Sequence, residues 1–334
     1  MIPTVGVVVL AWRSEPWLRE CVASIRGSRG VDVRLLVVDN GCEPGDLPDG
    51  VEILEPGHNT GFAGGCNLGV AALQQSASPD FVALVNSDCV LEPDTLALLA
   101  AEAARPGVGP VMASVRLGDT PELINSAGNP VHLIGLSWAG GMGEKETRTE
   151  PFDVTGASGA CVLLAGAVWK QLGGFDEEYF AYLEDTELSL RCRRLGLAAR
   201  CVPTAVARHH YEFSRNPAKM TLLERNRLML LATVWPRRML LLLAPLLVPC
   251  EVLLLGYAIA SGYGRGKLGG YRWLWQHRAH LAARRALLRD EQVVPDREWI
   301  KQLTPTLDAS AFGPLTPVAN GVFRVYWSLV SGLV

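Results

Sequence analysis

Runs of β-branched and other apolar residues, with no polar residues alternating between them, recur through the first half of the chain. Two such runs, at 4–10 and 33–38, flank a segment at 16–25 whose apolar side chains fall at helical spacing. Strands that are apolar on both faces are typical of a parallel sheet that helices cover on each side. We therefore expect an α/β fold with a mostly parallel, Rossmann-like sheet flanked by helices. Further strands are expected near 51–54, 81–85, 108–115 and 161–166, and further helices near 64–75, 94–104, 167–172 and 184–195.

Much of the chain's apolar character is concentrated in one late segment. The 334 residues carry a net charge of −3 and a mean hydropathy of +0.18, which is high for a soluble enzyme. In the apolar segment 239–262 only Glu251 is charged, and the following segment, 264–289, has seven basic residues and no acid. Because that basic segment carries +7, the rest of the chain carries −10. This distribution predicts a catalytic domain at 1–220 and a helical, membrane-associating region at 221–334.

Composition excludes several other classes of protein. A content of 49% hydrophobic and 19% charged residues excludes intrinsic disorder. The net negative charge argues against a nucleic-acid-binding protein, which would need a surplus of Lys and Arg. The eight cysteines show no CxxC motif or paired short spacing, no His/Cys cluster has zinc-ligand spacing, and the N-terminus lacks the basic region of a signal peptide. We therefore expect free, mostly buried thiols in a reducing cytoplasm.

Acids and amides follow two of the expected strands. Asp39-Asn40 ends the run VVDN, and Asn86-Ser87-Asp88 ends the run VNSD. Ligands of open parallel sheets bind beyond the carboxyl ends of the strands. A carboxylate at the first position can accept the ring N–H of a pyrimidine base, and one at the second suits a divalent cation that bridges diphosphate oxygens. Taken alone, each motif is also typical of a turn or a helix cap.

Three further motifs carry polar or flexible residues. The segment NTGFAGGCN at 59–67 has glycines that allow close backbone approach to a ligand, although a tight strand-to-helix turn needs them equally. The segment GGFDEEYFAYLED at 173–185 ends in two acids that open a helix, where either helix capping or a general base explains them. The segment HHYEFS at 209–214 places two histidines on an extended chain, so at most one faces a site.

The order of these motifs resembles family 2 of the inverting glycosyltransferases, which have the GT-A fold. The similarity is greater to the bacterial rhamnosyltransferase branch, which builds cell-wall and surface polysaccharides. It extends from about residue 3 to 235 and includes RNRL at 225–228. The resemblance implies a metal-dependent hexosyltransferase that transfers a sugar from a nucleotide-sugar donor to a glycan or lipid-linked acceptor.

The resemblance also implies roles for individual residues. Asp39 would bind the nucleotide base, with Trp12 beside it. Asp88, the last carboxylate of a DxD-type motif that here reads NSD, and His209 would bind Mg²⁺ or Mn²⁺. Asp185 would be the catalytic base, whereas Glu187 departs from the usual EDxD pattern and puts an acceptor contact in question. The other donor-binding candidates are Asn59, Gly61, Phe62, Asn67 and Asn86, and the acceptor-binding candidates are Glu184 and Trp138, which lies in the polar, glycine-rich stretch 116–155 expected to be flexible.

Several readings of donor and activity stay open at this stage. The branch favours dTDP-rhamnose, but thymine and uracil offer the same ring N–H to Asp39, so a UDP-sugar remains an alternative donor. A non-catalytic nucleotide-sugar-binding membrane protein is a second alternative. The presence of Asp88 and Asp185 argues against it. A nucleotidyltransferase would carry a glycine-rich, basic loop after the first strand, and LAWRSEPW at 10–17 has no such glycines.

The apolar segment 239–262 has 24 residues, enough to cross a hydrocarbon core of roughly 30 Å at about 1.5 Å per residue. Pro245, Pro249 and Glu251 argue against a simple span. A buried helix pair or a homo-oligomer interface is the alternative. We expect a monotopic or peripheral element at the cytoplasmic face of the bacterial inner membrane, with the basic segment 264–289 on anionic headgroups. Such an enzyme suits a polyprenyl-diphosphate-linked acceptor.

Overall fold

The fold is described from a computed structural model of the chain, which covers residues 2–43, 48–76, 78–210 and 216–334. The chain divides into two compact units. The sheet unit comprises Met1–Asn129, Ala139–Cys192 and Leu197–Phe213, and the helical unit comprises Pro130–Trp138, Arg193–Gly196 and Ser214–Val334. The change from sheet to helices thus falls near residue 213, with two short earlier segments in the helical unit.

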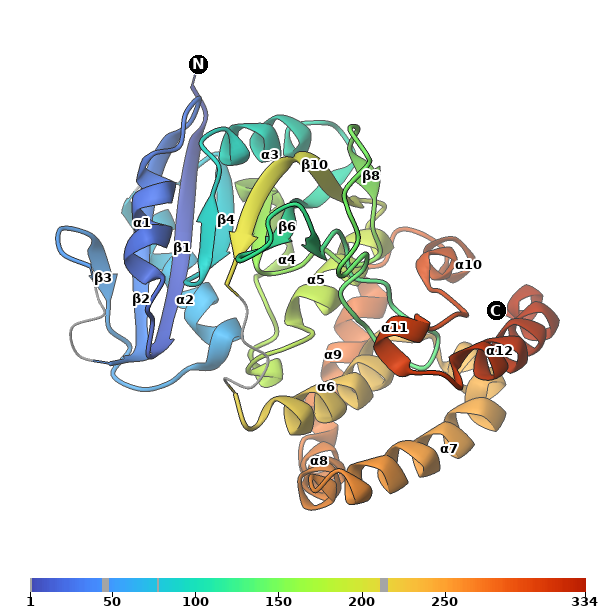
Figure 1. The fold of residues 1–334 in the computed structure, drawn as a ribbon. Helices are drawn as coiled ribbons and strands as arrows, with labels where there is room; N and C mark the ends of the chain where they lie inside the picture. Colours follow the sequence, from blue (N-terminus) through green and yellow to red (C-terminus); the bar gives the residue numbers. More distant parts are fainter. Residues whose placement is uncertain (1, 44–47, 77, 211–215) are drawn as a thin grey trace. The chain divides into compact units, whose positions relative to one another are not determined.

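A ten-stranded mixed sheet in the order β3-β2-β1-β4-β9-β6-β10-β5 forms the centre of the sheet unit (Figure 1). Strands β3, β2, β1 and β4 are mutually parallel, and so are β6 and β10. Strand β9 runs antiparallel to both of its neighbours, β4 and β6. The α/β architecture is therefore as expected, with β9 joining two parallel parts. The strands are β1 (Thr4–Arg13), β2 (Asp32–Cys42), β3 (Glu52–Leu54), β4 (Phe81–Asn86), β5 (Cys89–Leu91), β6 (Val108–Leu117), β9 (Cys161–Ala165) and β10 (Ala198–His209).

Helix α2 packs on this sheet through small residues. Helix α2 lies so close to β1 and β2 that a Cβ atom at Gly69 would meet Val8 at 2.6 Å and Val38 at 3.0 Å. A glycine is needed wherever two backbones approach this closely. The helices are α1 (Leu18–Arg26), α2 (Gly61–Ser76), α3 (Thr95–Ala103), α4 (Gly166–Leu172), the short η1 (Glu177–Tyr179) and α5 (Glu184–Arg194).

The polar stretch 116–155 joins the sheet at two places. Strand β7 (Ile124–Ser126) pairs with β6, and strand β8 (Phe152–Asp153) pairs with β10. Both pairings are antiparallel, and the bridge between Leu123 and Lys145 adds a third contact within the stretch. The stretch that we expected to be flexible therefore follows a path set partly by backbone hydrogen bonds.

The helical unit contains the C-terminal helices that the sequence predicts. Trp235 and Trp299 lie in its core, with ring centroids 6.3 Å apart. Arg285 donates hydrogen bonds to carbonyls at the C-terminal end of α6. The elements are α6 (Lys219–Val234), α7 (Arg237–Ala260), α8 (Gly264–Gln276), α9 (Arg278–Asp290), α10 (Asp296–Trp299), η3 (Ile300–Gln302), α11 (Ala309–Phe312), α12 (Thr316–Val330) and η4 (Ser331–Leu333).

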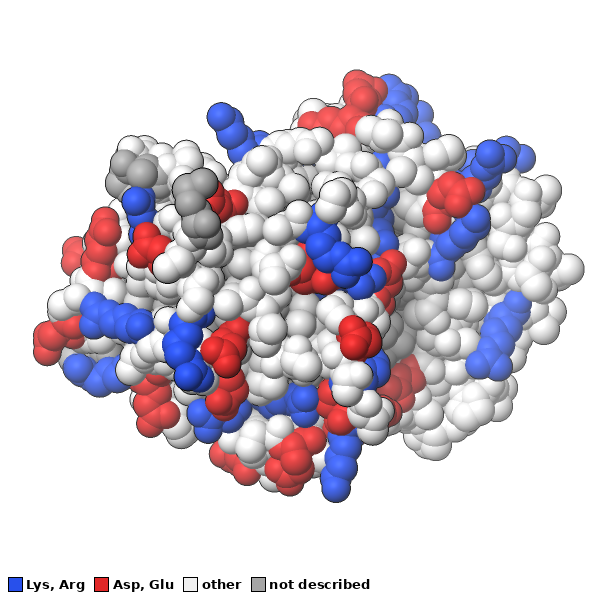
Figure 2. Space-filling view, turned by 90° about the horizontal axis from the view of Figure 1, so that it is seen from above, with Lys and Arg blue, Asp and Glu red and all other residues white. Residues whose placement is uncertain are grey.

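Charged side chains of both signs are interspersed over the face of the molecule shown in Figure 2. No extended basic surface is visible on that face, in keeping with the net charge of −3.

Candidate functional site

The motifs at the strand ends lie at one edge of the sheet. In the parallel register of β1, β2 and β4, Ala11 is paired with Asp39 and Leu10 with Asn86. Trp12 is the penultimate residue of β1. The structure therefore brings together Trp12, Asp39 and Asn86, three of the residues predicted to bind a donor, because parallel strands end on the same side.

The Asp39 carboxylate organises the turn that follows its strand. Its Oδ1 atom accepts hydrogen bonds from the backbone N–H groups of Gly41 at 3.1 Å and Cys42 at 2.8 Å. Within the described residues no hydrogen bond reaches Oδ2. The turn-forming and base-binding interpretations are therefore compatible, since each uses a different oxygen of the same carboxylate.

Asn59 and Gly61 shape the entrance to α2. The Asn59 Oδ1 atom accepts from the Gly61 N–H at 2.9 Å and from the amide of Asn40, also at 2.9 Å. Asn40 is 1% exposed and accepts from both the backbone and the hydroxyl of Thr60. Gly61 has φ +73°, and a Cβ there would meet the Phe180 carbonyl oxygen at 2.3 Å. Only glycine fits this turn.

Asn67 connects α2 to the GGFD turn at 173–176. Its side chain accepts from the Phe175 N–H at 2.9 Å and donates to the Phe175 carbonyl at 3.1 Å and to Glu177 at 3.0 Å. A Cβ at Gly174, where φ is +77°, would lie 2.4 Å from the Asn67 oxygen. The structure thus places two of the predicted motifs side by side, and Phe62 lies with its ring centroid 6.1 Å from that of Phe175.

Asp88 and His209 form the candidate metal centre. The antiparallel pairing of β10 with β5 sets His209 opposite Cys89, directly after Asp88. The His209 Nε2 atom lies 3.0 Å from Asp88 Oδ1, and the two residues are 6% and 8% exposed. One ligand atom from each of Asp88, Cys89 and His209 lies within 4.8 Å of the others.

The chemistry of this donor set fits a divalent cation. Carboxylate oxygen suits Mg²⁺ and Mn²⁺, and imidazole nitrogen is a common additional ligand for transition metals. Burial, reinforced by the charge of Asp88, raises the pKa of the Cys89 thiol well above its ordinary value. Because a thiol must lose its proton to bind a metal, Asp88 and His209 are the ligands of choice here.

Asn125 supports His209 from β7, and sequence reasoning missed it. The Asn125 Oδ1 atom lies 3.0 Å from His209 Nδ1, and Asn125 is 6% exposed. The Asn125 amide nitrogen donates to the sulfur of Met142 at 3.7 Å, and the amide oxygen faces the ring. With a cation bound between Nε2 and Asp88, Nδ1 would carry the proton and donate it to Asn125. No local motif marks Asn125, which is 84 residues from His209 in the sequence.

Asp185 lies in the first turn of α5, where a backbone cradle holds it. Its Oδ2 accepts from the Gly159 N–H at 2.8 Å, and its Oδ1 accepts from the Thr186 N–H at 2.6 Å. Burial nevertheless raises the pKa of the Asp185 carboxyl above its ordinary value. Gly159 is a second residue that sequence reasoning missed, and a Cβ there would come within 3.4 Å of Asp185.

Glu184 differs from its neighbour although the two are adjacent in sequence. It is 5% exposed, and its Oε2 atom is buried without a hydrogen-bond partner among the residues that the structure describes. Burial and the charge of Asp185 raise the pKa of Glu184 well above its ordinary value. Glu184 also raises the pKa of Cys66 on α2, after the larger effect of burial on that thiol. A neutral carboxyl beside an ionisable one is a common arrangement in catalytic sites.

Glu187, the departure from the family pattern, holds a structural ion pair. It is fully buried and its carboxylate binds Arg191 Nε at 2.9 Å. Arg191 also donates to the carbonyls of Leu172 and Gly174. The pair therefore fixes the GGFD turn against α5, and its i,i+4 spacing is a signal that sequence reasoning could have used.

Trp138 and Ser214 are the remaining residues that the sequence motifs singled out. Trp138 belongs to the helical unit, where its ring lies edge-on to Phe312 with centroids 5.4 Å apart. Ser214, at the end of HHYEFS, lies outside the described residues. His210 is described, and its ring stacks on Trp17 at 3.5 Å.

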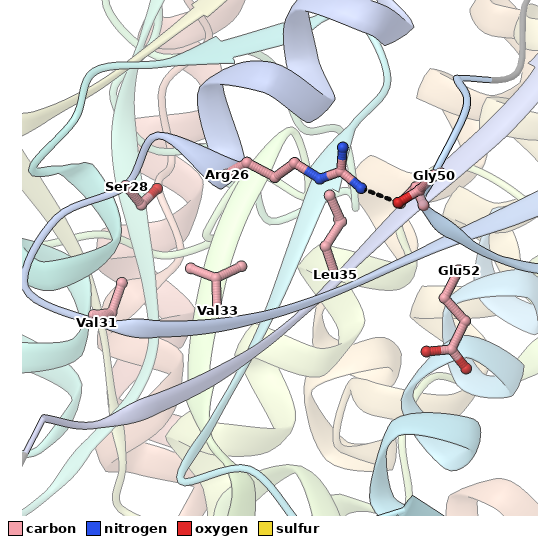
Figure 3. Close-up of a pocket in the computed structure, with 8 residues that line it drawn as sticks. Arg26, Ser28, Val31, Val33, Leu35, Gly50 and Glu52 are labelled. Carbon is pink, nitrogen blue, oxygen red and sulfur yellow. Dashed lines mark hydrogen bonds between the residues drawn. The ribbon is translucent and has the colours of Figure 1, made fainter.

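A separate pocket of about 380 Å³ lies at the opposite end of β2 (Figure 3). The Arg26 guanidinium, at the end of α1, donates to the Gly50 carbonyl across it. Polar atoms supply more of the lining surface than apolar atoms do, and none of the candidate residues above contributes to it. Its lining residues are Arg26, Ser28, Val31, Val33, Leu35, Gly50, Val51 and Glu52.

Comparison with solved structures defines the class of fold. The chain is similar to GalNAc-T7 in complex with UDP, GalNAc and Mn²⁺, with a TM-score of 0.60 and 15% identity over 71% of this chain and 49% of that one, about half its length. It is also similar to a mannosyltransferase from Pyrobaculum calidifontis in complex with GDP-Man and Mn²⁺, with a TM-score of 0.50 and 17% identity over 87% and 86% of the two chains. The fold is that of the GT-A glycosyltransferases.

The sequence comparisons identify the family. The profile described as "Glycosyltransferase like family 2" matches residues 3–229, and the chain belongs to this family. An N-acetylglucosaminyl-diphospho-decaprenol L-rhamnosyltransferase of Mycobacterium tuberculosis is 29% identical over 65% of this chain and 80% of its own length. The low-salt glycan biosynthesis hexosyltransferase Agl10 of Haloferax volcanii is 23% identical over 58% of this chain and 63% of its own. The protein is a glycosyltransferase.

Proposed function

We propose that this glycosyltransferase moves rhamnose from dTDP-rhamnose onto a polyprenyl-diphosphate-linked glycan in cell-wall or surface polysaccharide synthesis. The mycobacterial relative supports this choice, because its name specifies rhamnosyl transfer to a decaprenyl-diphosphate-linked sugar. The observation that carries the proposal is the combination of a buried Asp88–His209 pair with a separately cradled Asp185 carboxylate. The Asp88–His209 pair suits a cation that binds the leaving diphosphate, and the Asp185 carboxylate suits removal of the acceptor proton.

The proposed reaction is a displacement that inverts the sugar C1. An acceptor hydroxyl is a weak nucleophile near neutral pH, so a positioned carboxylate must take its proton as the C–O bond forms. Asp185 performs this step, and its raised pKa brings it nearer to the pH at which it works. Asp39 accepts the ring N–H of the base through its Oδ2 atom. The bond from C1 to the diphosphate breaks on the opposite face, and the nucleoside diphosphate leaves with the bonding electrons.

Asp88 and His209 would hold Mg²⁺ or Mn²⁺, and the presence of Mn²⁺ in both solved relatives supports this choice. A divalent cation supplies charge stabilisation for the departing diphosphate. In the same proposal the enzyme works at the cytoplasmic face of the bacterial inner membrane, where a lipid-linked acceptor presents its sugar. The mycobacterial relative's acceptor carries a decaprenyl chain.

A panel of nucleotide sugars tests the donor. Thermal unfolding of the purified chain is measured with dTDP-rhamnose, a UDP-hexose and UDP-N-acetylhexosamine, each with and without Mn²⁺. The proposal expects a metal-dependent rise of the melting temperature that is largest with dTDP-rhamnose, because a ligand that binds only the folded state stabilises it. A larger rise of the melting temperature with a UDP-sugar would show that the donor is that UDP-sugar and not dTDP-rhamnose.

A second assay separates catalysis from binding. Release of nucleoside diphosphate is followed with dTDP-rhamnose, Mn²⁺ and a polyprenyl-diphosphate-linked N-acetylglucosamine acceptor. Acceptor-dependent release supports transfer. Binding of the donor with neither transfer nor hydrolysis would instead favour the non-catalytic nucleotide-sugar-binding protein.

A further inference from the structure

We propose that the exposed apolar faces of α7 and α12 form one docking surface that lies in the plane of an anionic bilayer. This proposal specifies how the protein would bind the membrane named in the proposed function. It depends on the proposed function only for which membrane that is. It assigns α12 as a second membrane-binding helix and orients α7 along the surface. By length and composition α7 could also cross a bilayer, the single such helix among the described residues, with only 11% of its most apolar window buried.

One face of α7 is exposed and free of polar side chains. Leu241 is 77% exposed, Val248 64% and Val252 66%. Intervals of three and four residues put side chains on the same face of a helix, so these positions form a continuous stripe. The stripe consists of Leu241, Pro245, Val248, Val252, Gly256 and Ile259.

The single acid of α7 is held on a different face by neighbouring helices. The Glu251 carboxylate binds Arg227 of α6 and both Lys267 and Tyr271 of α8. Burial disfavours its charge, but Arg227, Lys267 and Tyr271 lower the pKa of Glu251 to about 2. Glu224 of α6 binds the same two cations. A helix that crossed the bilayer would carry this charged cluster into hydrocarbon, whereas a helix in the membrane plane leaves it outside.

Helix α12 presents a second stripe of the same kind. On its opposite face Phe323 is 5% exposed and packs against His132, with ring centroids 4.5 Å apart. Tyr326 joins α12 to α7 by donating to the Leu242 carbonyl at 2.6 Å. The stripe consists of Leu315, Val318, Val322, Val325 and Leu329, which are 56–78% exposed.

The charges near these stripes favour an anionic lipid surface as the occupant. Glu251 is the only acid in α7, α8 and α12. A second copy of the chain would bring like charges together, whereas anionic headgroups complement them. Trp275, which is 70% exposed on α8, suits the headgroup region. The exposed cations of these helices are Arg237, Arg238, Arg265, Arg272 and Arg324.

Two residues of the basic segment 264–289 do not take part. Lys267 is 1% exposed because it binds Glu224 and Glu251. Arg285 donates to the carbonyls of Leu231, Ala232 and Trp235. The expectation that the whole segment contacts headgroups was therefore too broad for these two side chains, whose partners lie within the protein.

Vesicle flotation tests the surface in the absence of donor and acceptor, so its outcome is independent of glycosyl transfer. The probes are vesicles of phosphatidylglycerol with phosphatidylethanolamine and vesicles of phosphatidylcholine alone. The variants are Val248→Glu on α7 and Val322→Glu on α12, and the matched control is Val293→Glu, which is 73% exposed and outside both stripes. We expect each stripe variant to lower binding to anionic vesicles at least tenfold, the control to bind as wild type, and neutral vesicles to bind more weakly.

Several results would contradict the proposal that these faces bind lipid. Wild-type protein that does not float, or stripe variants that float as wild type does, would remove the lipid assignment. Light scattering that shows a dimer dissociated by Val322→Glu, with flotation unchanged, would make the stripe a contact between copies. In spheroplasts, a protease added from outside should leave both ends of the chain intact. If the protease instead digests the helices that follow α7, then α7 spans the membrane.

Discussion

His209 and Asn125 are joined by a hydrogen bond between Nδ1 and Oδ1 at 3.0 Å, on the side of the ring opposite Asp88. In a neutral histidine that donates one ring N–H, the other nitrogen is an acceptor and can bind a metal. Asn125 is therefore expected to prepare His209 Nε2 for a metal, although it lies outside every motif of the sequence.

Replacing Asn125 tests this role without measuring turnover. Asn125→Leu should lower Mn²⁺ affinity roughly 10–100-fold, since partners that orient a metal ligand typically contribute that much. The measurement is titration of free Mn²⁺ by electron paramagnetic resonance. Asn125→Asp keeps an acceptor for the Nδ1 proton and should retain most of the affinity. Equal affinity in the Leu variant and wild type would show that Asn125 only fills space.

The raised pKa of Asp185 predicts an unusual acid limit for the reaction. The base must be deprotonated, so the rate falls as pH falls through its pKa, and burial moves that fall to a higher pH than an ordinary aspartate would give. A kcat–pH profile with saturating donor and metal measures the limb. The Glu184→Gln variant should retain this acid limb, because Glu184 stays neutral over the pH range in which Asp185 titrates. If the limb vanishes in Glu184→Gln, the titrating group is Glu184.

Burial of Glu184 predicts a pH-dependent cost in stability. Its pKa is raised in the folded state, so the folded protein holds the proton more tightly than the unfolded chain. This carboxyl therefore lowers the free energy of unfolding progressively as pH rises above the ordinary pKa of about 4.3. The loss is about 1.4 kcal/mol for each pH unit that separates the unfolded-state pKa from the folded-state pKa.

Glu184→Gln removes this titration and keeps the shape of the side chain. Its melting temperature should exceed that of wild type at pH 7–8, and the difference should close near pH 4. Thermal unfolding across that range provides the measurement. A variant less stable than wild type at pH 8 would mean that the ionised carboxylate has a stabilising partner.

The α/β class and the edge that carries the site followed from sequence because both depend on local patterns. Apolar runs identify strands, and parallel strands end on one side of a sheet, so Asp39 and Asn86 could be placed together. The antiparallel direction of β9 was not predictable, since a buried apolar run looks the same in either direction.

Residues that act through distant partners were beyond the sequence patterns. Gly159 donates to Asp185 across 26 positions of the sequence, and Arg194 donates to the Val234 carbonyl across 40 positions. The length and hydropathy of α7 likewise could not show that Glu251 faces Arg227 and Lys267, because the partners come from two other helices. Such contacts depend on the packing of the whole unit.

The stereochemistry of the product tests the central claim most directly. Nuclear magnetic resonance of the glycoside formed from dTDP-rhamnose gives the configuration at C1 for wild type and for Asp185→Asn. We predict an inverted linkage with wild type and a loss of transfer of roughly 10²–10⁴-fold in the variant, with donor binding unchanged. A retained configuration, or turnover undiminished in Asp185→Asn, would contradict the account.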